Sequence, residues 1–395
     1  MSRLEELIEQ YCPDGVEWKT LGELCNIKGR IGFRGYTRND QVKEGEGALS
    51  LSPSNIQEGQ MDYSKGTYIT WAKYEESPEI KTYNGDIILC KTASVGKVAL
   101  VKALPYKATI NPQLVVLKDI KCSTPFLTYV LGTGEVQRKI ISMAGVGSVP
   151  NIPQKALAEI EIPVPPLPVQ EEIVRILDNF TELQAELQAE LQKRLQQYNF
   201  YRDNLLNFKN INRGGQTEVK WMKLSEVAQV CRGTRVVKSQ LSNKGYQVYQ
   251  NCLTPMGYYD KANCKGGTPF VICGGAAGNV GYSIVDYWAA DDCEYIVSGS
   301  EVCNKYLYYY LMTKQDYLSS QVRKASVPRL SPIVIKDLVI PIPSLDEQQR
   351  IVSILDRFDT LTNDLTAGLP AEIDKRRQQY EYYRDKLLTF KRKAA

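Results

Sequence analysis

The chain has 395 residues, 43% hydrophobic and 24% charged, and its 49 basic and 45 acidic side chains leave a formal net charge of +4. This composition excludes a disordered or fibrous protein, and the length favours two domains over one. The apolar runs are far shorter than the roughly 20 residues of a membrane helix. The N-terminus has no signal-like apolar segment, so we expect a cytoplasmic protein.

The residue types exclude most catalytic and metal chemistry. Histidine is absent, and the ten cysteines contain no C-x-x-C pair. His-based nucleophile pairs and zinc sites therefore lack their bases and ligands. We expect reduced, mostly buried thiols and no metal site. Neither a P-loop nor a glycine-rich cofactor motif nor an adenine-methyltransferase motif occurs, so we expect no catalytic residues.

An internal repeat organises the chain. Residues 162–180 match residues 340–358 at eleven of nineteen positions, and residues 196–209 match residues 378–391 at ten of fourteen. Coincidence does not produce such identity, and the repeat indicates two copies of one connecting segment.

Weaker matches precede each copy. Trp18 and Trp221 stand in similar surroundings, and Ser148-Val-Pro150 matches Ser326-Val-Pro328. The stretch from tryptophan to the Ile-Pro motif is 25 residues longer in the first half, and the two stretches are otherwise hard to align. We predict two dissimilar modules on two similar connectors, with segments 1–165, 166–212, 213–343 and 344–395.

The first connector predicts one long amphipathic helix. Its prolines end at Pro168, and neither proline nor glycine follows before Gly214. We expect a helix from about 168 to 209, on the order of 60 Å long. Three consecutive tetrapeptides across residues 182–193 shift its apolar stripe round the helix, so that the stripe can touch more than one partner. A solvated helix packed on one neighbour is the alternative.

In the second connector Gly368 and Pro370 predict a break between two helices, about 346–366 and 370–391. The two connectors are expected to pair as an antiparallel coiled coil within the chain. The candidate partner and helix-interface residues are Ile173, Ile176, Leu177, Phe180, Leu183, Leu187, Leu191, Leu195, Tyr198, Ile351, Ile354, Leu355, Phe358, Leu361 and Leu365.

Several loops of the modules carry side chains suited to DNA. Residues 29–38 and 231–238 are basic, and arginine both reaches phosphates and pairs with guanine. Residues 91–97 and 273–279 follow apolar strand candidates at matching places, and amides in nearby turns can read adenine. Each loop taken alone is also what a solvated turn looks like. The candidate DNA-binding residues are Arg30, Arg34, Arg38, Lys91, Thr92, Ser94, Lys97, Asn111, Gln113, Arg232, Arg235, Lys238, Gln250, Asn251 and Asn279.

Two patterns occur twice in the same order, I-P-x-P-x-L…Q…I-V-x-I-L-D-x-F and Q-Q-Y-x-[FY]-Y-R-D-x-L-L-x-F. With them the whole chain resembles the specificity (S) subunit of type I restriction–modification enzymes. The resemblance implies an α+β fold with a pseudo-twofold internal repeat. Two mixed α/β target-recognition domains, 1–165 and 213–343, would be joined by the helical regions 166–212 and 344–395.

The resemblance also implies a non-catalytic DNA reader. Each recognition domain would read one half of a bipartite, asymmetric sequence in double-stranded DNA, and the helices would set the half-site spacing and dock two methyltransferase (M) subunits. Restriction and translocase (R) subunits would join that core. This chain would bind no cofactor, since S-adenosylmethionine, ATP and magnesium would belong to the partners.

Two other hypotheses stay open at this point. The chain could be a coiled-coil structural adaptor without DNA specificity, whose helices join proteins. A self-sufficient modification enzyme is the third hypothesis, but it lacks every motif that its chemistry needs.

Overall fold

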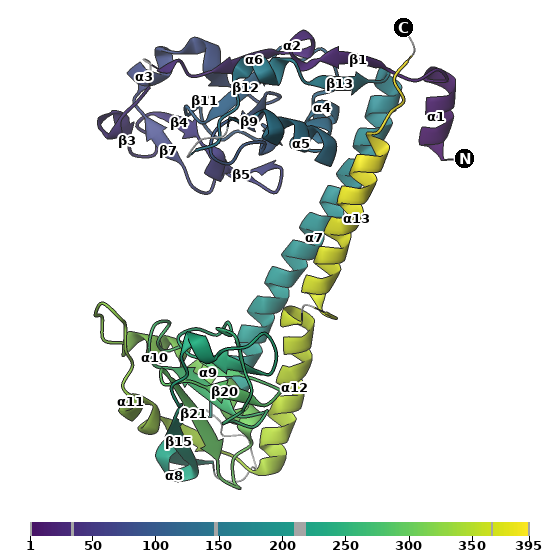
Figure 1. The fold of residues 1–395 in the computed structure, drawn as a ribbon. Helices are drawn as coiled ribbons and strands as arrows, with labels where there is room; N and C mark the ends of the chain where they lie inside the picture. The colour runs from purple at the N-terminus through teal and green to yellow at the C-terminus, as the bar shows by residue number, and fades with distance from the viewer. Residues whose placement is uncertain (1, 33–34, 146–148, 209–218, 365, 394–395) are drawn as a thin grey trace. The chain divides into compact units, whose positions relative to one another are not determined.

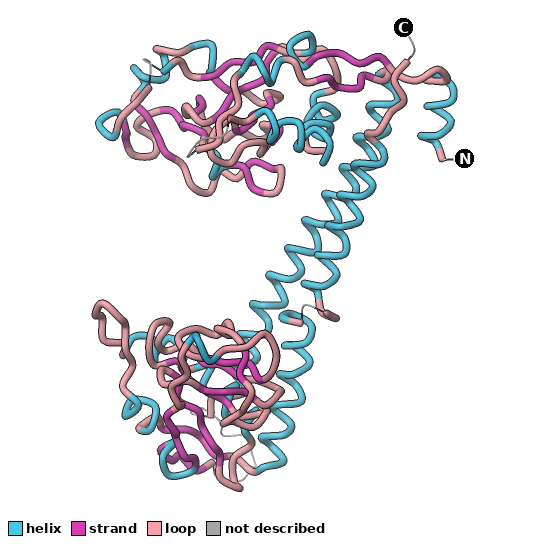
Figure 2. The backbone as a smooth tube through the Cα atoms, viewed as in Figure 1, coloured by secondary structure: helices cyan, strands magenta, loops and turns pink. Residues whose placement is uncertain are grey.

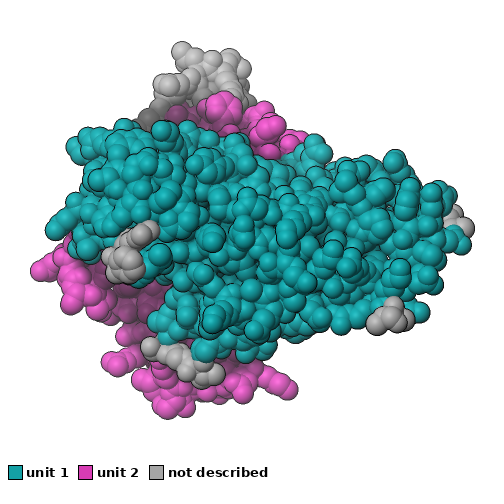
Figure 3. All heavy atoms as spheres, turned by 90° about the horizontal axis from the view of Figure 1, so that it is seen from above, with its two compact units in different colours: residues 1–186, 373–395 teal, residues 187–372 magenta. Residues whose placement is uncertain are grey.

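The structure is a computed structural model that describes residues 2–32, 35–145, 149–208, 219–364 and 366–393 (Figure 1). The chain forms two compact units, which Figure 3 distinguishes by colour. The first unit is Met1–Glu186 with Ile373–Ala395, and the second is Leu187–Glu372. The boundary falls within helix α7 (Leu167–Leu205), so each unit contains part of both connectors. The four predicted segments follow the repeat and remain a prediction.

The first unit contains two larger sheets and, among the described residues, the short hairpin pair β5–β6. An antiparallel sheet has the order β10-β9-β12-β2, and a mixed sheet has the order β3-β7-β4-β11-β8, in which β11 and β4 are parallel. A separate pair joins β1 to β13, with Trp18 opposite Pro163. The strands are β1 (Glu17–Thr20), β2 (Asn26–Gly29), β3 (Gln41–Val42), β4 (Ala48–Leu51), β5 (Ile56–Gln57), β6 (Gln60–Met61), β7 (Thr67–Ile69), β8 (Lys81–Thr82), β9 (Ile87–Cys90), β10 (Val98–Leu100), β11 (Ala108–Ile110), β12 (Leu114–Lys118) and β13 (Glu161–Val164).

The second unit repeats this arrangement with shorter connections. Its antiparallel sheet has the order β15-β21-β18-β19, its mixed sheet the order β17-β16-β20 with β16 and β20 parallel, and β14 pairs with β22. Trp221 lies opposite Pro341, as Trp18 lies opposite Pro163. The strands are β14 (Lys220–Lys223), β15 (Ala228–Arg232), β16 (Tyr246–Tyr249), β17 (Tyr258–Tyr259), β18 (Pro269–Ile272), β19 (Val280–Tyr282), β20 (Tyr287–Ala289), β21 (Cys293–Ser298) and β22 (Val339–Ile342).

The two modules therefore share the strand order of the antiparallel sheet and one parallel pair in the mixed sheet, although their sequences are hard to align. Thirty-five residues separate β4 from β9, whereas nineteen separate β16 from β18. The longer stretch holds β5, β6 and α3 and contributes most of the 25 extra residues that the sequence shows.

The helices also repeat, and Figure 2 separates them from strands and loops. In the first unit α4 and α5 follow the antiparallel sheet, as α9 and α10 do in the second. The second connector is two helices, as predicted, since α12 ends at Asn363 and α13 begins at Leu369. The helices other than α7 are α1 (Arg3–Tyr11), α2 (Leu21–Leu24), α3 (Trp71–Glu75), α4 (Thr124–Leu131), α5 (Gly134–Met143), α6 (Gln154–Ala158), α8 (Leu224–Val227), α9 (Asn304–Thr313), α10 (Gln315–Ser320), α11 (Pro332–Lys336), α12 (Leu345–Asn363) and α13 (Leu369–Leu387).

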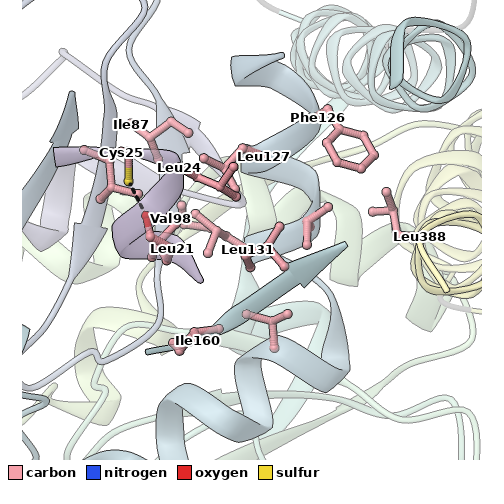
Figure 4. Packing of buried hydrophobic residues seen from close by; sticks show 14 of the residues in the cluster. Leu21, Leu24, Cys25, Ile87, Val98, Phe126, Leu127, Leu131, Ile160 and Leu388 are labelled. Atoms are coloured by element: carbon pink, nitrogen blue, oxygen red, sulfur yellow. Dashed lines mark hydrogen bonds between the residues drawn. The ribbon is translucent and has the colours of Figure 1, made fainter. Parts of the chain in front are cut away.

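The core of the first unit lies between its antiparallel sheet and its helices. Phe126 and Leu131 of α4 are fully buried, and each contributes about 1.5–3 kcal/mol relative to an exposed side chain. Figure 4 shows both residues in the core, where Phe126 lies beside Leu388, which follows α13. The end of the chain thus packs into the core of the N-terminal module. There it also pairs with Val16, whose amide donates to the carbonyl of Lys391 (2.9 Å).

Polar residues of the first repeated pattern dock each connector on its own module. The side chain of Gln170 accepts from the amide of Ser123 (2.9 Å) and donates to the carbonyl of Pro165. In the second unit Gln348 accepts from the amide of Cys303 (2.8 Å) and donates to the carbonyl of Pro343. Both glutamines are buried. The repeated glutamine therefore fixes where the helix leaves the module.

The repeated Ile-Leu-Asp sequence has a similar role. The phenol of Tyr129 donates to Asp178 in the first unit, and the phenol of Tyr309 donates to Asp356 in the second, each at 2.5 Å. Burial, followed by the hydrogen bond to the carboxylate, raises the pKa of both tyrosines well above the usual value. The phenols therefore stay protonated and keep donating at neutral pH.

Antiparallel helix pairing is present within each unit. In the first unit α7 runs beside α13 (Figure 1). Phe180 of α7 stacks on Tyr383 of α13 with ring centroids 5.6 Å apart. In the second unit α7 runs beside α12, and Tyr201 stacks on Phe358 at 5.4 Å. The first pattern of one copy thus meets the second pattern of the other copy, and this exchange explains why both patterns occur twice.

The predicted helix-interface residues differ in burial, and one of them lies outside the described residues. The core of the first unit buries Ile173 and Leu177, and the core of the second unit buries Ile351, Leu355 and, from the first connector, Tyr198. Leu183 and Leu361 are 48% and 37% exposed, so they are not buried between the two helices and remain candidates for contact with a partner. Leu365 lies outside the described residues. The remaining partly buried members are Ile176, Phe180, Leu187, Leu191, Leu195, Ile354 and Phe358.

The ten cysteines are free thiols, as predicted, and six of them are buried. Burial raises the pKa of Cys25 and of Cys273 to about 12, so these thiols are protonated and unreactive at neutral pH. Within the described ranges, no helix combines the length and the apolar character that crossing a bilayer demands.

Candidate DNA interface

The loops 91–97 and 273–279 are the same turn in the two units. The first joins β9 to β10 and the second joins β18 to β19. The amide of Gly96 donates to the carbonyl of Cys90 (2.9 Å), and the amide of Gly278 donates to the carbonyl of Ile272 (2.8 Å). Since the bonds join equivalent positions, the matching places that the sequence suggested are confirmed as one loop geometry.

Backbone dihedrals repeat as well. Gly96 and Gly278 have φ of 94° and 93°, a region that favours glycine. Three residues earlier in each loop, Ala93 has φ of 65° and Gly275 has φ of 82°. An alanine held in this region carries strain that the surrounding contacts must offset. Ala93 is therefore held in this conformation by its tethers, whereas the three glycines adopt theirs readily.

The repeated Ser-Val-Pro segment supplies one of these tethers. The amide of Ala93 donates to the carbonyl of Pro150 (2.9 Å), and the amide of Gly275 donates to the carbonyl of Pro328 (3.1 Å). A second tether comes from helices α5 and α10, where Gln137 donates to the carbonyl of Gly96 and Gln315 accepts from the amide of Val280. Each loop is thus held by two elements distant in sequence.

The side chains on this common frame differ completely. At the four polar positions, the first loop carries Lys91, Thr92, Ser94 and Lys97, whereas the second carries Cys273, Gly274, Ala276 and Asn279. Ser94 and Lys97 are exposed, and Asn279 is partly exposed. A fixed backbone that presents different donors and acceptors is the arrangement that two different base sequences require.

Other predicted residues gather at the first loop. The carbonyl of Gln113 accepts from the amides of Lys91 (2.9 Å) and Thr92 (3.3 Å). Asn111 is nearby, but it is 9% exposed and its carboxamide bonds both the amide and the side chain of Gln113. Asn111 therefore holds the turn and is not an available base reader. Gln113 is partly exposed and remains a candidate.

The second loop gathers Arg232, Gln250 and Asn251. The carbonyl of Asn251 accepts from the amide of Ala276 (2.9 Å), while Arg232 and Gln250 both donate to Asp291, at its carbonyl (3.2 Å) and its carboxylate (3.3 Å). The sequence prediction therefore selected residues that lie together around this loop.

Sequence reasoning missed three residues of these clusters. Asn151 accepts a hydrogen bond from the hydroxyl of Thr92 (2.7 Å), and Arg329 forms an ion pair with Asp292 at 3.0 Å. Asn151 and Arg329 each follow the repeated Ser-Val-Pro directly. Their equivalent positions in the repeat were the sequence signal that could have identified Asn151 and Arg329. Asp292 has no comparable sequence signal, because its partner Arg329 is 37 residues away.

The basic loop 29–38 behaves differently from the prediction. Arg30 is only 4% exposed, and its guanidinium donates to the carbonyl of Ile110 and to the hydroxyl of Thr109, each at 3.1 Å. Burial lowers the pKa of the Arg30 guanidinium, because the protein interior solvates the charged form less well than water does. Arg30 is therefore a structural residue, and its assignment to DNA contact is corrected.

Three of the other predicted basic residues remain candidates for contact with DNA. Arg34 lies outside the described residues. Arg38 is exposed in a short 3-10 helix (Arg38–Asp40), and Arg235 and Lys238 are exposed beside the second mixed sheet. Solvent exposure leaves these side chains able to reach phosphates.

One acidic side chain is enclosed beneath the second cluster. Glu294 lies on β21 opposite Arg232 and is 4% exposed. Burial raises the pKa of its carboxyl, an effect that the charge of Arg232 opposes. Among the described residues, no group of three or more acidic or cysteine side chains is arranged to hold a metal ion.

The geometry defines a protein that carries the same loop frame twice, once in each unit. Comparison with known sequences identifies the family to which such a protein belongs. The family model of the type I restriction modification DNA specificity domain matches residues 13–197 and again residues 216–375. The chain therefore belongs to this family, that of the specificity subunits of type I restriction–modification systems.

Curated relatives agree with this assignment. A Haemophilus influenzae protein named as a type I restriction enzyme specificity subunit is 31% identical over 98% of this chain and 98% of its own length. The EcoR124I/EcoR124II specificity subunit of Escherichia coli is 34% identical, over 61% of this chain and 62% of its own length. A Mycoplasma pneumoniae type I specificity subunit is 35% identical over 58% of this chain and 93% of its own length.

Solved structures share the fold. The type I restriction–modification S subunit from M. genitalium matches with a TM-score of 0.58 and 17% identity, over 95% of this chain and 96% of that one. A chain from a study of complex assembly and conformational transition of a type I system matches with a TM-score of 0.60 and 18% identity, over 95% and 98%. At this identity the likeness is one of fold alone.

Proposed function

We propose that this chain reads a bipartite, asymmetric DNA sequence, one half with each unit, for a type I restriction–modification complex. The observation that supports this proposal is the shared loop frame: its backbone hydrogen bonds repeat in the two units, while its exposed side chains differ. In the first unit Lys97, Ser94 and Gln113 would face the duplex. In the second, Asn279, Gln250 and Arg232 would do so.

The chain itself would contribute recognition and not catalysis. S-adenosylmethionine, ATP and magnesium would bind to the partner subunits, and the helices would hold the two units at a set spacing. The modest net charge of +4 fits a reader that shares phosphate contacts with its partners.

Exposed aromatic residues support docking of two methyltransferase subunits on the connectors. Phe200 is 64% exposed and Tyr382 is 61% exposed, at equivalent positions of the repeat. Each packs edge-on against the next ring, that of Tyr201 or Tyr383, which stacks on the facing helix. Exposed aromatic rings that a neighbouring ring holds in place are typical anchors of protein interfaces.

The docking proposal has a stoichiometric test. Phe200→Ala and Tyr382→Ala should each remove one methyltransferase subunit, so that native mass spectrometry finds one M subunit per chain instead of two. Tyr11→Ala is the matched control, because Tyr11 is an exposed aromatic (44%) outside both connectors. Full occupancy in both single variants would reject the docking surface.

The DNA proposal is tested on the chain assembled with its methyltransferase subunits. Methylated adenines are first mapped in a host genome, and duplexes are then made with one base changed in either half-site. Ser94→Ala with Lys97→Ala should weaken discrimination in one half-site and leave discrimination in the other unchanged. Equal affinity of the wild-type complex for every duplex would overturn the proposal. Unchanged DNA affinity after neutralising the exposed residues Arg38, Arg235 and Lys238 would favour the structural adaptor.

A further inference from the structure

A basic hairpin projects from the second unit beside its recognition loop. It lies between α10 and α11, and Arg323 and Arg329 close it with two backbone hydrogen bonds of 2.9 and 3.2 Å. Arg323, Lys324 and Arg329 are all exposed, and Val327 near the tip is 48% exposed. Three cations within seven residues give this hairpin a concentrated positive charge.

The base of the hairpin is fixed to the recognition loop. Pro328 accepts from the amide of Gly275 (3.1 Å), and the amide of Leu330 donates to the carbonyl of Cys273 (2.9 Å). Leu330 itself is buried in the core, and the guanidinium of Arg329 is held by Asp292. The hairpin is therefore continuous with the second cluster, and its cations are placed relative to the loop 273–279.

The first unit has the same hairpin base without the charge. There the amide of Gly145 donates to the carbonyl of Asn151 (3.0 Å), in the positions that Arg323 and Arg329 occupy in the second unit. The closing pair is thus common to both units, whereas the sequence places cations there in the second unit only. Closing the pair by backbone hydrogen bonds does not require the side chains of Arg323 and Lys324.

We propose that the hairpin 323–329 binds backbone phosphates of the duplex next to the half-site read by the second unit. The inference rests on the proposed function and adds a sequence-independent contact that the first unit lacks. Arg323 and Lys324 would bind phosphates, while Arg329, paired with Asp292, positions the hairpin. Phosphates are the expected ligands because exposed, closely spaced cations beside a base-reading loop contact the backbone more often than the bases.

The test uses the full chain assembled with its methyltransferase subunits. Arg323→Ala with Lys324→Ala should lower the slope of log affinity against log salt by about two, at roughly 0.9 per phosphate. Affinity should fall by the same factor for cognate duplexes and for duplexes altered in the second half-site. The discrimination ratio should therefore stay at its wild-type value.

Lys244→Ala with Lys261→Ala is the matched control. These lysines are exposed in the same unit and lie at the end of the β16–β17 pair opposite Gln250. The control should keep the wild-type slope. A wild-type slope in the hairpin variant, or an equal loss in the control, would overturn the inference. So would a hairpin variant that assembles poorly but binds DNA normally once assembled, since that result indicates an acidic protein partner.

Failure of the underlying function gives a different result. A wild-type complex that binds all duplexes equally would remove the proposed function itself. A wild-type complex with intact discrimination and an unaffected hairpin variant would remove only the phosphate contact.

Discussion

Removing one tetrapeptide from α7 should shorten the gap between the two half-sites without changing the bases read. Deleting residues 186–189 takes four residues out of the helix, about 6 Å of length, and turns the remainder by about 40°. One base pair of duplex rises roughly 3.4 Å. The expected change is therefore a gap shorter by one or two base pairs.

The structure indicates that the deletion leaves both cores intact. It falls between Phe180 and Tyr201, so neither aromatic stack loses a member. Glu186, Gln188 and Ala189 are exposed and Leu187 is only partly buried, so the segment contributes little to either core. The thermal unfolding midpoint should stay close to that of the wild type.

The assay is methylation-site mapping in a host that lacks other adenine methylation. Duplicating residues 186–189 is the matched control and should lengthen the gap by the same amount. Replacing Glu186 with Ala keeps the helix length and should leave the gap unchanged. Altered half-site bases with an unaltered gap would refute the reasoning, because they would place base selection in the helix.

Three further changes have expected outcomes. Gly278→Ala puts a Cβ 2.8 Å from the hydroxyl of Ser319 at a φ of 93°, which costs about 1–3 kcal/mol of strain. Methylation of sites should slow about tenfold, while an unchanged rate would show that the turn is not part of the reading surface. Tyr309→Phe leaves the Asp356 carboxylate without its phenol donor and should lower the free energy of unfolding by about 1–3 kcal/mol, measured by urea denaturation. Alkaline pH should also destabilise the protein. The thiol pKa of Cys25 and of Cys273 is about 12 in the folded chain and about 8.5 in an unfolded one. The folded state favours the neutral thiol, so this stability is complete below pH about 8.5 and is lost as the pH rises towards 12. Urea midpoints that do not fall between about pH 7 and pH 10 would contradict it.

The helical architecture was predictable from sequence because its signals are local. Prolines, Gly368 and apolar periodicity placed α7 and the break between α12 and α13 within a few residues. The common topology of the modules was not predictable in this way. It depends on backbone hydrogen bonds, which tolerate almost any side chain, so the two sequences diverged while the sheets kept their order.

The site was predictable only where position in the repeat carried the information. The loops 91–97 and 273–279 were found by their matching places, and Arg232 lies beside the second of them. Arg30 was misassigned because its burial depends on Thr109 and Ile110, about 80 residues away in sequence. Exposed and buried arginines look alike until such partners are located.

The exchange of patterns between the connectors also affects the order of folding during synthesis. The second unit, Leu187–Glu372, is one continuous stretch, whereas the first unit needs Leu388 and the pairing of Val16 with Lys391. Domains usually fold as they leave the ribosome, the N-terminal one first. Here the N-terminal module can complete its core only after residues 388–391 are made. A premature stop near the C-terminus would therefore destabilise the half of the protein that was made first.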